Sequence, residues 1–175
     1  MGEWANGRIS EWANGRMGEW ANGRMSEWES GWWQLTYEEW QLRVPSAIKR
    51  EPVWELYGYR KALYLFDRVW EDCGKFMHDQ RGRIISDQLI RSSGSISANI
   101  EEGHGRGVAG KEYQQFLRYA LASARETKGW FYRAKELLSA DAVEHRYALT
   151  DEVIALLITE IERQRKRLNV ARTQT

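Results

Sequence analysis

After residue 52, apolar residues recur at every third or fourth position, which is the spacing of one face of an α-helix. Four such stretches can be drawn, at about 53–78, 83–102, 110–138 and 141–169. No stretch shows the two-residue alternation of a half-buried strand. Because short connections between long amphipathic helices place neighbours antiparallel, the pattern predicts an all-α protein, an up-down-up-down four-helix bundle.

The residues between these stretches are typical of helix ends. The run QRG at 80–82 predicts a break after the first helix, and Gly103 predicts the end of the second. The glycine-rich run GHGRGVAG at 103–110 would then connect the second helix to the third. Ser139 and Asp141 are candidate N-caps for the step into the fourth helix.

The chain opens with an octapeptide, MGEWANGR, which recurs with two changes at 9–16 and unchanged at 17–24, and continues in decayed form to residue 33. A period of eight matches neither a helix nor a strand, and each full copy carries an Asn-Gly turn signal. The nucleotide octamer ATGGGCGA, repeated head to tail, translates to this peptide in every frame. We therefore interpret 1–33 as a translated DNA microsatellite, a disordered or poorly structured arm with a translation start inside or beyond it. The alternative is a selected, Trp-rich interaction arm.

The rest of the chain divides into a linker at 34–51, the bundle at 52–170 and a short tail at 171–175. The net charge of +1 imposes no strongly basic surface on the whole molecule. The lone Cys73 excludes an internal disulfide and fits a reducing compartment. No apolar run is long enough to cross a membrane and no signal peptide is visible, so a cytoplasmic protein is expected.

Small residues fill the middle of the second helix, with serine, glycine or alanine at all but one position of 92–98. Because glycine and serine have low helix propensity, this stretch needs tertiary packing to compensate. In one interpretation the small side chains let another helix approach, and the hydroxyls bond to carbonyls one turn back. In the other, Asn99 and Glu102 are polar anchors of a site beside Arg91.

The run SISANIEEGHGRG at 95–107, followed by Phe116, Leu117, Ala120 and Glu126, resembles the 23S rRNA-intervening-sequence protein family. Glu101 stands where that family usually has Ala, and Tyr113 where it has its first Phe. The resemblance covers about 53–168 and leaves out the N-terminal repeat. The motif positions, which we expect to shape the second helix and its packing, are Ser95, Ile96, Asn99, Ile100, Glu102 and Gly103.

The resemblance implies a small four-helix bundle without catalytic activity that assembles as a homo-oligomer, a pentamer in several members. Many members are encoded within insertions in the large-subunit rRNA gene. A related branch serves diversity-generating retroelements, where a basic pentamer contacts a reverse transcriptase and nucleic acid. The partners implied are therefore rRNA, another nucleic acid or a reverse transcriptase, with no membrane and no cofactor.

Binding to RNA grows with the number of phosphates neutralised, and basic residues here are matched by nearly as many acids. A monomer would bind weakly, whereas a ring of subunits could concentrate cations on one surface. The alternative is that these cations form solvated faces with local ion pairs. The candidate nucleic-acid contacts are Arg91, Arg106, Arg163, Arg165, Lys166 and Arg167.

Enzyme chemistry has little support in the sequence. Glu101 and His104 form a single Glu-x-x-His pair, whereas a di-iron bundle needs two such pairs and two further Glu residues. With Gly103 ending the helix, that pair would not project together into a core, so no metal site is expected. Cys73 lies on an apolar stripe and fits a buried small hydrophobe better than a nucleophile.

Three consecutive aromatic residues, Trp130, Phe131 and Tyr132, spread over more than half of the third helix's circumference. At least one must therefore be exposed or contact a neighbouring subunit, where aromatic side chains are favoured anchors. The sequence predicts a non-catalytic, oligomeric bundle that contacts RNA or a nucleic-acid-processing partner. The alternative is a protein-protein interaction scaffold that binds no nucleic acid.

Overall fold

The structure is a computed structural model that describes residues 35–173, with side chains through residue 170. The chain divides into two units, Met1–Leu42 and Arg43–Thr175. The octapeptide repeat predicted to form a disordered arm at 1–33 lies outside the described residues. Two short helices, α2 (Tyr37–Arg43) and α3 (Ser46–Lys49), occupy the range interpreted as a linker.

α2 begins with a capping box, in which a hydroxyl and a carboxylate each satisfy a free N–H at the helix start. Thr36 Oγ1 accepts from the Glu39 N–H at 3.3 Å, and Glu39 Oε2 accepts from the Thr36 N–H at 2.9 Å. The rings of Tyr37 and Trp40 stack within the helix, with 5.7 Å between their centroids. These local contacts explain a helix that no long apolar stripe predicts.

Helices make up the regular structure of the second unit. A 3₁₀ turn, η2 (Pro52–Glu55), is followed by α4 (Tyr57–Phe76), α5 (Gln80–Arg106), α6 (Lys111–Arg133) and α7 (Ala140–Thr173). No strand occurs among residues 35–173, so the predicted all-α class is confirmed for this part of the chain. None of these helices is long and apolar enough to cross a membrane.

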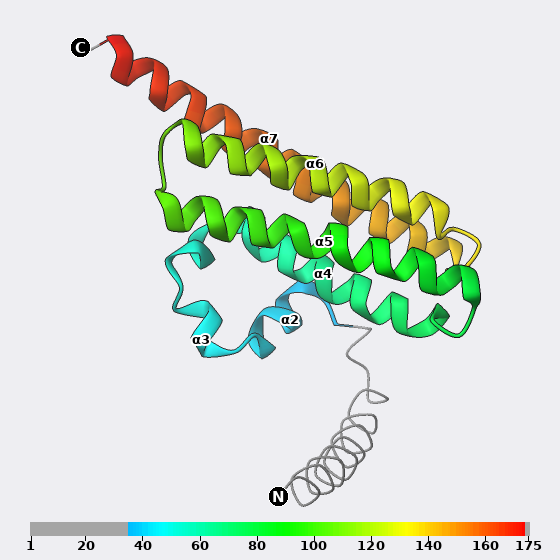
Figure 1. Cartoon of the computed structure of the whole chain (residues 1–175). Coiled ribbons are helices and arrows are strands. Elements are labelled where there is room, and N and C mark those ends of the chain that lie inside the picture. Colours follow the sequence, from blue (N-terminus) through cyan, green and yellow to red (C-terminus); the bar gives the residue numbers. More distant parts are fainter. Residues whose placement is uncertain (1–34, 174–175) are drawn as a thin grey trace, which may run out of the picture. The chain divides into compact units, whose positions relative to one another are not determined.

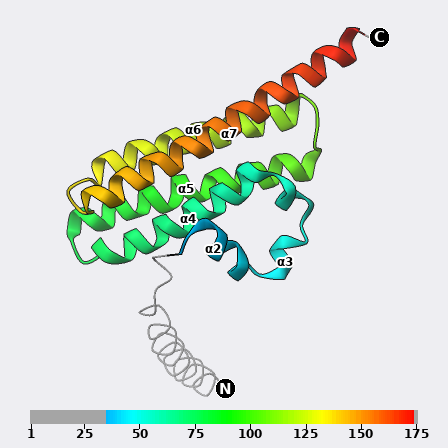
Figure 2. The same cartoon turned by 180° about the vertical axis from the view of Figure 1, so that it is seen from behind.

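The four long helices lie side by side, and successive helices run in opposite directions (Figures 1 and 2). α7 packs against α6 and also against α4, which closes the arrangement. One polar contact marks each neighbouring pair: Tyr59 with Glu101, Ser95 with Ser123, Lys128 with Asp151, and Asp72 with Arg146. This packing is consistent with the predicted up-down-up-down bundle.

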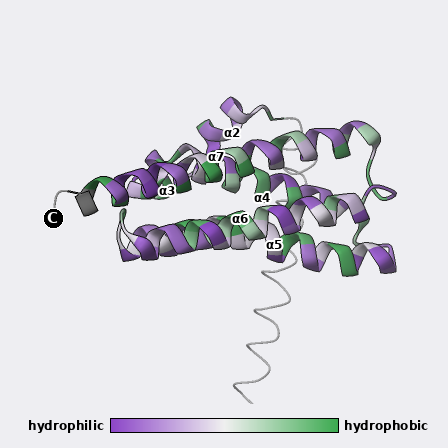
Figure 3. Cartoon of the chain, turned by 90° about the horizontal axis from the view of Figure 1, so that it is seen from above, coloured by the Kyte–Doolittle hydropathy of each residue, from purple (hydrophilic) through white to green (hydrophobic). Residues whose placement is uncertain are grey.

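Apolar stripes of the four helices meet in one core. Hydrophobic and hydrophilic residues alternate around each helix (Figure 3), as amphipathic helices require. Leu65, Leu89, Leu117 and Leu157 come one from each long helix, and all four are fully buried. On α5, Ile96 and Ile100 share the face of Leu89 by their spacing and are buried there too.

Two predicted helix ends are wrong, and both involve close packing. α5 begins at Gln80, two residues before Gly82, because Asp79 caps it by accepting from the N–H groups of Arg81 and Gly82. α5 also runs through Gly103 and ends at Arg106, before Gly107 with a φ of 140°. A Cβ at Gly103 would lie 2.7 Å from the Cβ of Phe116, so glycine here lets α6 approach.

A third predicted helix end is also wrong, whereas the step into α7 agrees with the sequence pattern. α6 ends at Arg133, a few residues before the predicted 138, and Ser139 caps α7 by accepting from the Ala142 N–H at 3.3 Å. Asp141, the other predicted cap, lies inside the first turn of α7, where an acidic side chain suits the helix dipole.

Cys73 is buried as predicted, and its chemistry follows from that position. Burial is the main cause that raises the pKa of the thiol to about 11. At pH 8 only about one thiol in a thousand is then ionised. We expect the folded protein to react with an aromatic disulfide reagent far more slowly than the same protein in concentrated urea. The release of the coloured thiol measures both rates. Complete reaction of the folded protein within minutes would contradict the buried position.

Candidate nucleic-acid interface

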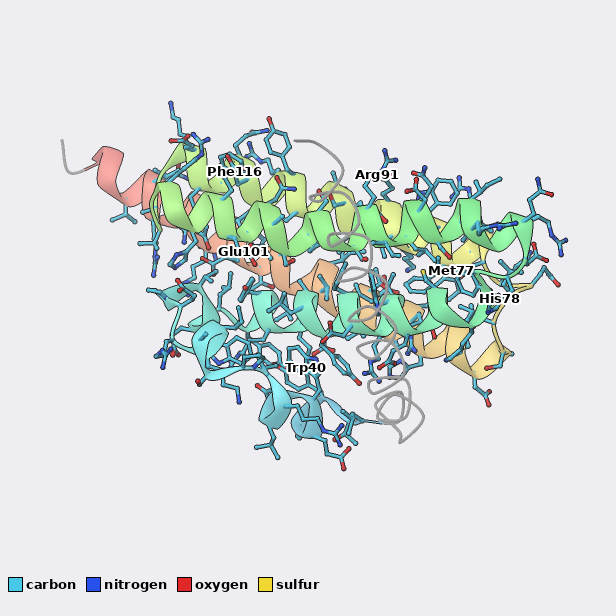
Figure 4. The ribbon with its side chains drawn as sticks, turned by 60° about the horizontal axis from the view of Figure 1, so that its bottom comes forward. Trp40, Met77, His78, Arg91, Glu101 and Phe116 are labelled. Atoms are coloured by element: carbon cyan, nitrogen blue, oxygen red, sulfur yellow. The ribbon has the colours of Figure 1, made fainter. Side chains whose placement is uncertain are left out.

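Three residues of the predicted motif, Ser95, Asn99 and Glu102, share one face of α5 with two predicted cations. Arg91, Ser95, Asn99, Glu102 and Arg106 follow one another at spacings of three or four residues, which places them on one side of the helix. Arg91 and Arg106 are nevertheless about 22 Å apart along the axis, at 1.5 Å per residue. Figure 4 shows Arg91 on the same outer side of the bundle as Phe116 of α6.

The motif residues hold α5 against α6. Asn99 Nδ2 donates to the Ser95 carbonyl at 2.7 Å and to its Oγ at 3.0 Å, and Ser123 of α6 donates to the same Oγ at 3.1 Å. Deeper in this seam, Thr127 Oγ1 lies 3.0 Å from Ser92 Oγ. These contacts favour the packing interpretation of the small residues over a polar site beside Arg91.

Arg106 is already matched by two carboxylates. Its Nε and Nη2 donate to Glu102 Oε1 at 3.1 and 2.7 Å, and its Nη1 donates to Glu112 Oε1 at 3.0 Å. The guanidinium also lies over the Phe116 ring, 5.1 Å from its centroid. The hydrogen bonds to Glu102 are the largest cause of its raised pKa. Arg106 therefore links the end of α5 to the start of α6. Because two carboxylates already neutralise its charge, Arg106 is less available to bind a phosphate.

Arg91 is less constrained. It donates to Gln88 one turn earlier, and its Nη2 lies 3.9 Å from Glu126 of α6. The same Glu126 carboxylate accepts from the Trp130 indole N–H at 3.3 Å. The side chain of Arg91 remains mostly exposed, so this cation could bind a phosphate after giving up one long ion pair.

The predicted cations of α7 lie at the opposite end of that helix from its Ser139 cap. Arg163 pairs with Glu160 at 3.5 Å. Arg165, Lys166 and Arg167 are exposed, and within residues 35–170 no carboxylate lies at ion-pair distance from them. These three are therefore the predicted contacts whose charge is most available to a phosphate.

α7 carries these cations past the end of its neighbour. Gln114 Nε2, in the first turn of α6, donates to the Ile161 carbonyl at 3.3 Å, so the antiparallel contact reaches its limit near residue 164. Beyond it the C-terminal part of α7 projects from the bundle (Figures 1 and 2). The structure thus brings Arg106 to the same end of the bundle as 163–167, and leaves Arg91 midway along α5.

Tyr113 marks where this basic run meets the bundle. Burial, followed by the charge of Glu160, raises the pKa of its phenol to about 12, while Arg163 and Arg167 act in the opposite direction. Gln164, beside them, is buried and donates to Glu160 Oε1 at 2.6 Å. The root of the projecting segment is therefore held by the bundle.

The three consecutive aromatic residues point in different directions, as their spacing requires. Phe131 is fully buried, Trp130 is half-buried, and Tyr132 is 59% exposed. Arg133 lies over the Trp130 ring at 4.8 Å, and Lys135 lies over the Tyr132 ring at 4.5 Å. Tyr132 is the member of the three that is open to a partner.

Sequence reasoning missed a group of buried charges between α4 and α7. Arg146 Nε donates to Asp72 Oδ2 at 2.6 Å, and Nη2 donates to Oδ1 at 3.2 Å. One turn away, Arg68 pairs with Glu71 at 2.8 Å, and burial is the largest cause that raises the pKa of the Glu71 carboxyl. Burial likewise lowers the pKa of His145, which contacts Arg146.

One signal for these charges was available. Asp72 interrupts the stripe that contains Val69 and Cys73, and Arg146 interrupts the stripe that contains Val143 and Val153. Charged residues at core positions are rarely tolerated without a partner of opposite charge. Nothing in the local spacing, however, says which acid faces which base.

The Glu-x-x-His pair is helical after all, since α5 continues to Arg106. Its two side chains meet different neighbours: Glu101 Oε1 accepts from the Tyr59 hydroxyl at 2.8 Å, whereas the His104 ring meets the edge of the Tyr113 ring. Figure 4 shows Glu101 on the side of α5 that faces α4. Among the described residues no group of three or more His, Cys, Asp or Glu side chains could hold a metal ion.

Comparison with known proteins agrees with this architecture. No curated protein matches the chain. A crystal structure of a protein with unknown function from the S23 ribosomal protein family of Bacteroides thetaiotaomicron superposes with a TM-score of 0.55 at 26% sequence identity. The alignment covers 59% of this chain and 97% of that one. The family model described as 23S rRNA-intervening sequence protein matches residues 55–159, from the end of η2 well into α7. The chain therefore belongs to the 23S rRNA-intervening sequence protein family.

Proposed function

We propose that this protein is a non-catalytic, homo-oligomeric bundle of the cytoplasm that binds RNA through the projecting part of α7. The observation that carries the proposal is the run of exposed cations at Arg165, Lys166 and Arg167, which have no carboxylate at ion-pair distance in the described part of the chain. A cation without a carboxylate partner can bind a phosphate without first breaking an ion pair. Membership of a family described by 23S rRNA-intervening sequences supports RNA as the nucleic acid.

Oligomerisation would multiply the effect of a short basic run. A single copy offers few phosphate contacts, whereas several linked copies on one RNA gain avidity without any new type of contact. Tyr132, with the half-buried Trp130 on the same helix, is the exposed aromatic surface that we assign to the contact between subunits. Tyr132 is in the last turn of α6, and that end of α6 lies away from the projecting part of α7 (Figure 1).

The test is RNA affinity of the full chain as a function of salt, measured by fluorescence anisotropy. Arg165→Glu combined with Arg167→Glu should lower affinity at least about tenfold near 0.1 M salt and reduce the slope of log K against log salt by about two. Arg83→Glu combined with Arg125→Glu is the matched control. It changes the net charge equally, and both residues are exposed and lie away from the projecting part of α7, so binding should be retained.

The second candidate is a scaffold that binds proteins and no nucleic acid, and the exposed Tyr132 favours it. A scaffold predicts no RNA binding at low salt by either the natural chain or its variants. A reverse transcriptase or another nucleic-acid-processing protein would then be the partner to test. Equal losses in the α7 variant and in its control would also contradict the assignment of the RNA site to α7.

A further inference from the structure

The cations at 163–167, where α7 leaves the bundle, occupy every side of the helix except the one that faces the bundle. Successive residues of an α-helix are about 100° apart, so Arg163 and Arg167 lie about 40° from each other on one side. Arg165 points about 160° away from both, and Lys166 lies on the outer side between them. The bundle-facing side belongs to the buried Gln164 and the partly buried Leu168. The result is a rod with cations on two opposite flanks.

A nucleic-acid single strand has one line of phosphates and can engage only one of these flanks at a time. A double helix has two lines of phosphates, one on each edge of a groove. An α-helix with its side chains is about 10–12 Å in diameter, so a helix lying along a groove can meet both edges at once. Double-stranded RNA is recognised largely in this way, through shape and backbone contacts across its wide minor groove.

The groups that single-strand binding uses are missing from this segment. Non-specific single-strand binders stack successive bases on aromatic side chains. The sequence from 161 to 175 contains no aromatic residue. At the root of the segment Tyr113 is buried, and Phe116 lies beneath the guanidinium of Arg106. Neither ring is presented to a base.

Base reading is equally limited. Specific recognition of base edges depends on side chains such as Asn, Gln and Arg that are placed in a groove by the rest of the interface. On the projecting segment the amide of Gln164 is buried and donates to Glu160. Apart from Asn169, the other polar side chains from 163 to 170 are the four cations, which suit contact with the sugar-phosphate backbone.

We propose that residues 163–167, where α7 leaves the bundle, bind double-helical RNA, with Arg163 and Arg167 on one phosphate backbone and Arg165 on the other. This inference rests on the proposed RNA binding through α7 and specifies its substrate class. Binding should therefore be independent of base sequence and should depend on the duplex state of the RNA.

The experiment compares a duplex RNA of 20 base pairs with each of its two single strands, chosen to lack self-structure, on the full chain. A single strand meets only one flank of α7 and therefore makes about one to two fewer phosphate contacts than a duplex. Each contact raises the affinity by close to a factor of ten near 0.1 M salt. The duplex should therefore bind at least about tenfold more tightly than either strand. A second duplex of unrelated sequence should bind equally well.

One-sided variants separate the two flanks. Arg165→Glu, and separately Arg163→Glu combined with Arg167→Glu, should each reduce the ratio of duplex to single-strand affinity toward one, whereas Arg83→Glu should leave it unchanged. Equal or tighter binding of single strands by the natural chain would overturn the duplex inference and leave the proposed RNA binding intact. Binding of neither form would overturn both.

Discussion

Asp72→Ala should destabilise the bundle by about 3–5 kcal/mol, because it leaves the Arg146 guanidinium buried and without its carboxylate. The Asp72 side chain is 0% exposed and that of Arg146 is 8% exposed, so water cannot replace the lost hydrogen bonds. Both oxygens of Asp72 accept from Arg146, which makes the contact bidentate. Urea unfolding at a fixed protein concentration, followed by circular dichroism, measures the loss.

Two controls separate the ion pair from general disruption of the core. Lys75 also reaches Asp72, at 3.2 Å, but its side chain is half exposed, so Lys75→Ala should cost less than about 1 kcal/mol. Asp72→Leu combined with Arg146→Met removes both charges and should cost less than Asp72→Ala alone. A double variant that loses as much as the sum of its two single changes would show that the charges are not coupled.

The helices themselves were predictable because their signal is local. Apolar residues three and four apart predict a helix, and on α5 the core positions at Leu89, Ile96 and Ile100 follow from that spacing alone. On α4 the same spacing also includes Trp70 and Met77, which are exposed. The partners of buried charges carry no such signal. Asp72 and Arg146 are 74 residues apart in the sequence, and only the packing of α7 onto α4 brings them together.

Helix ends were predicted less well, since tertiary contacts override the local rules there. Gly103 would end an isolated helix, but in α5 it is the residue that leaves room for Phe116. Glycine costs about 1 kcal/mol in helix propensity relative to Ala, and the close packing of α5 against α6 offsets this cost. The same seam explains the serines at 92–97, whose hydroxyls bond to backbone carbonyls or to α6.

In the candidate interface, too, the sequence shows where the cations are, but only the fold shows which of them have a carboxylate partner. A count of basic residues treats Arg106 and Arg165 alike, because both lie near helix ends. Arg106 is matched by Glu112, which lies across a tight connection and is brought near by the fold. Arg165 lies beyond the contact of Gln114 with Ile161, where α7 extends past α6. Which cations remain available therefore depends on the relative lengths of α6 and α7.

Gly82→Ala should destabilise the bundle by about 2–3 kcal/mol, as expected for added volume in a space that cannot expand. A Cβ at this position would overlap the carbonyl oxygen of Phe76 and lie 2.9 Å from its carbonyl carbon. The obstacle is backbone, so no side-chain rotation relieves it. Relief would require the connection between α4 and α5 to shift, together with the Asp79 cap that begins α5.

Gly74→Ala is the matched control, because it makes the same chemical change near the end of α4, where a Cβ would have no neighbour within 4 Å. Removing a glycine from an open helical position should stabilise the protein by about 0.5–1 kcal/mol. The two variants should therefore shift the urea midpoint in opposite directions. A gain in stability with Gly82→Ala would mean that the turn at 77–79 yields easily. The sequence pattern at 80–82 would then indicate a flexible break between the helices. A loss of stability would show instead that position 82 requires glycine, because the backbone of α4 passes too close for any side chain.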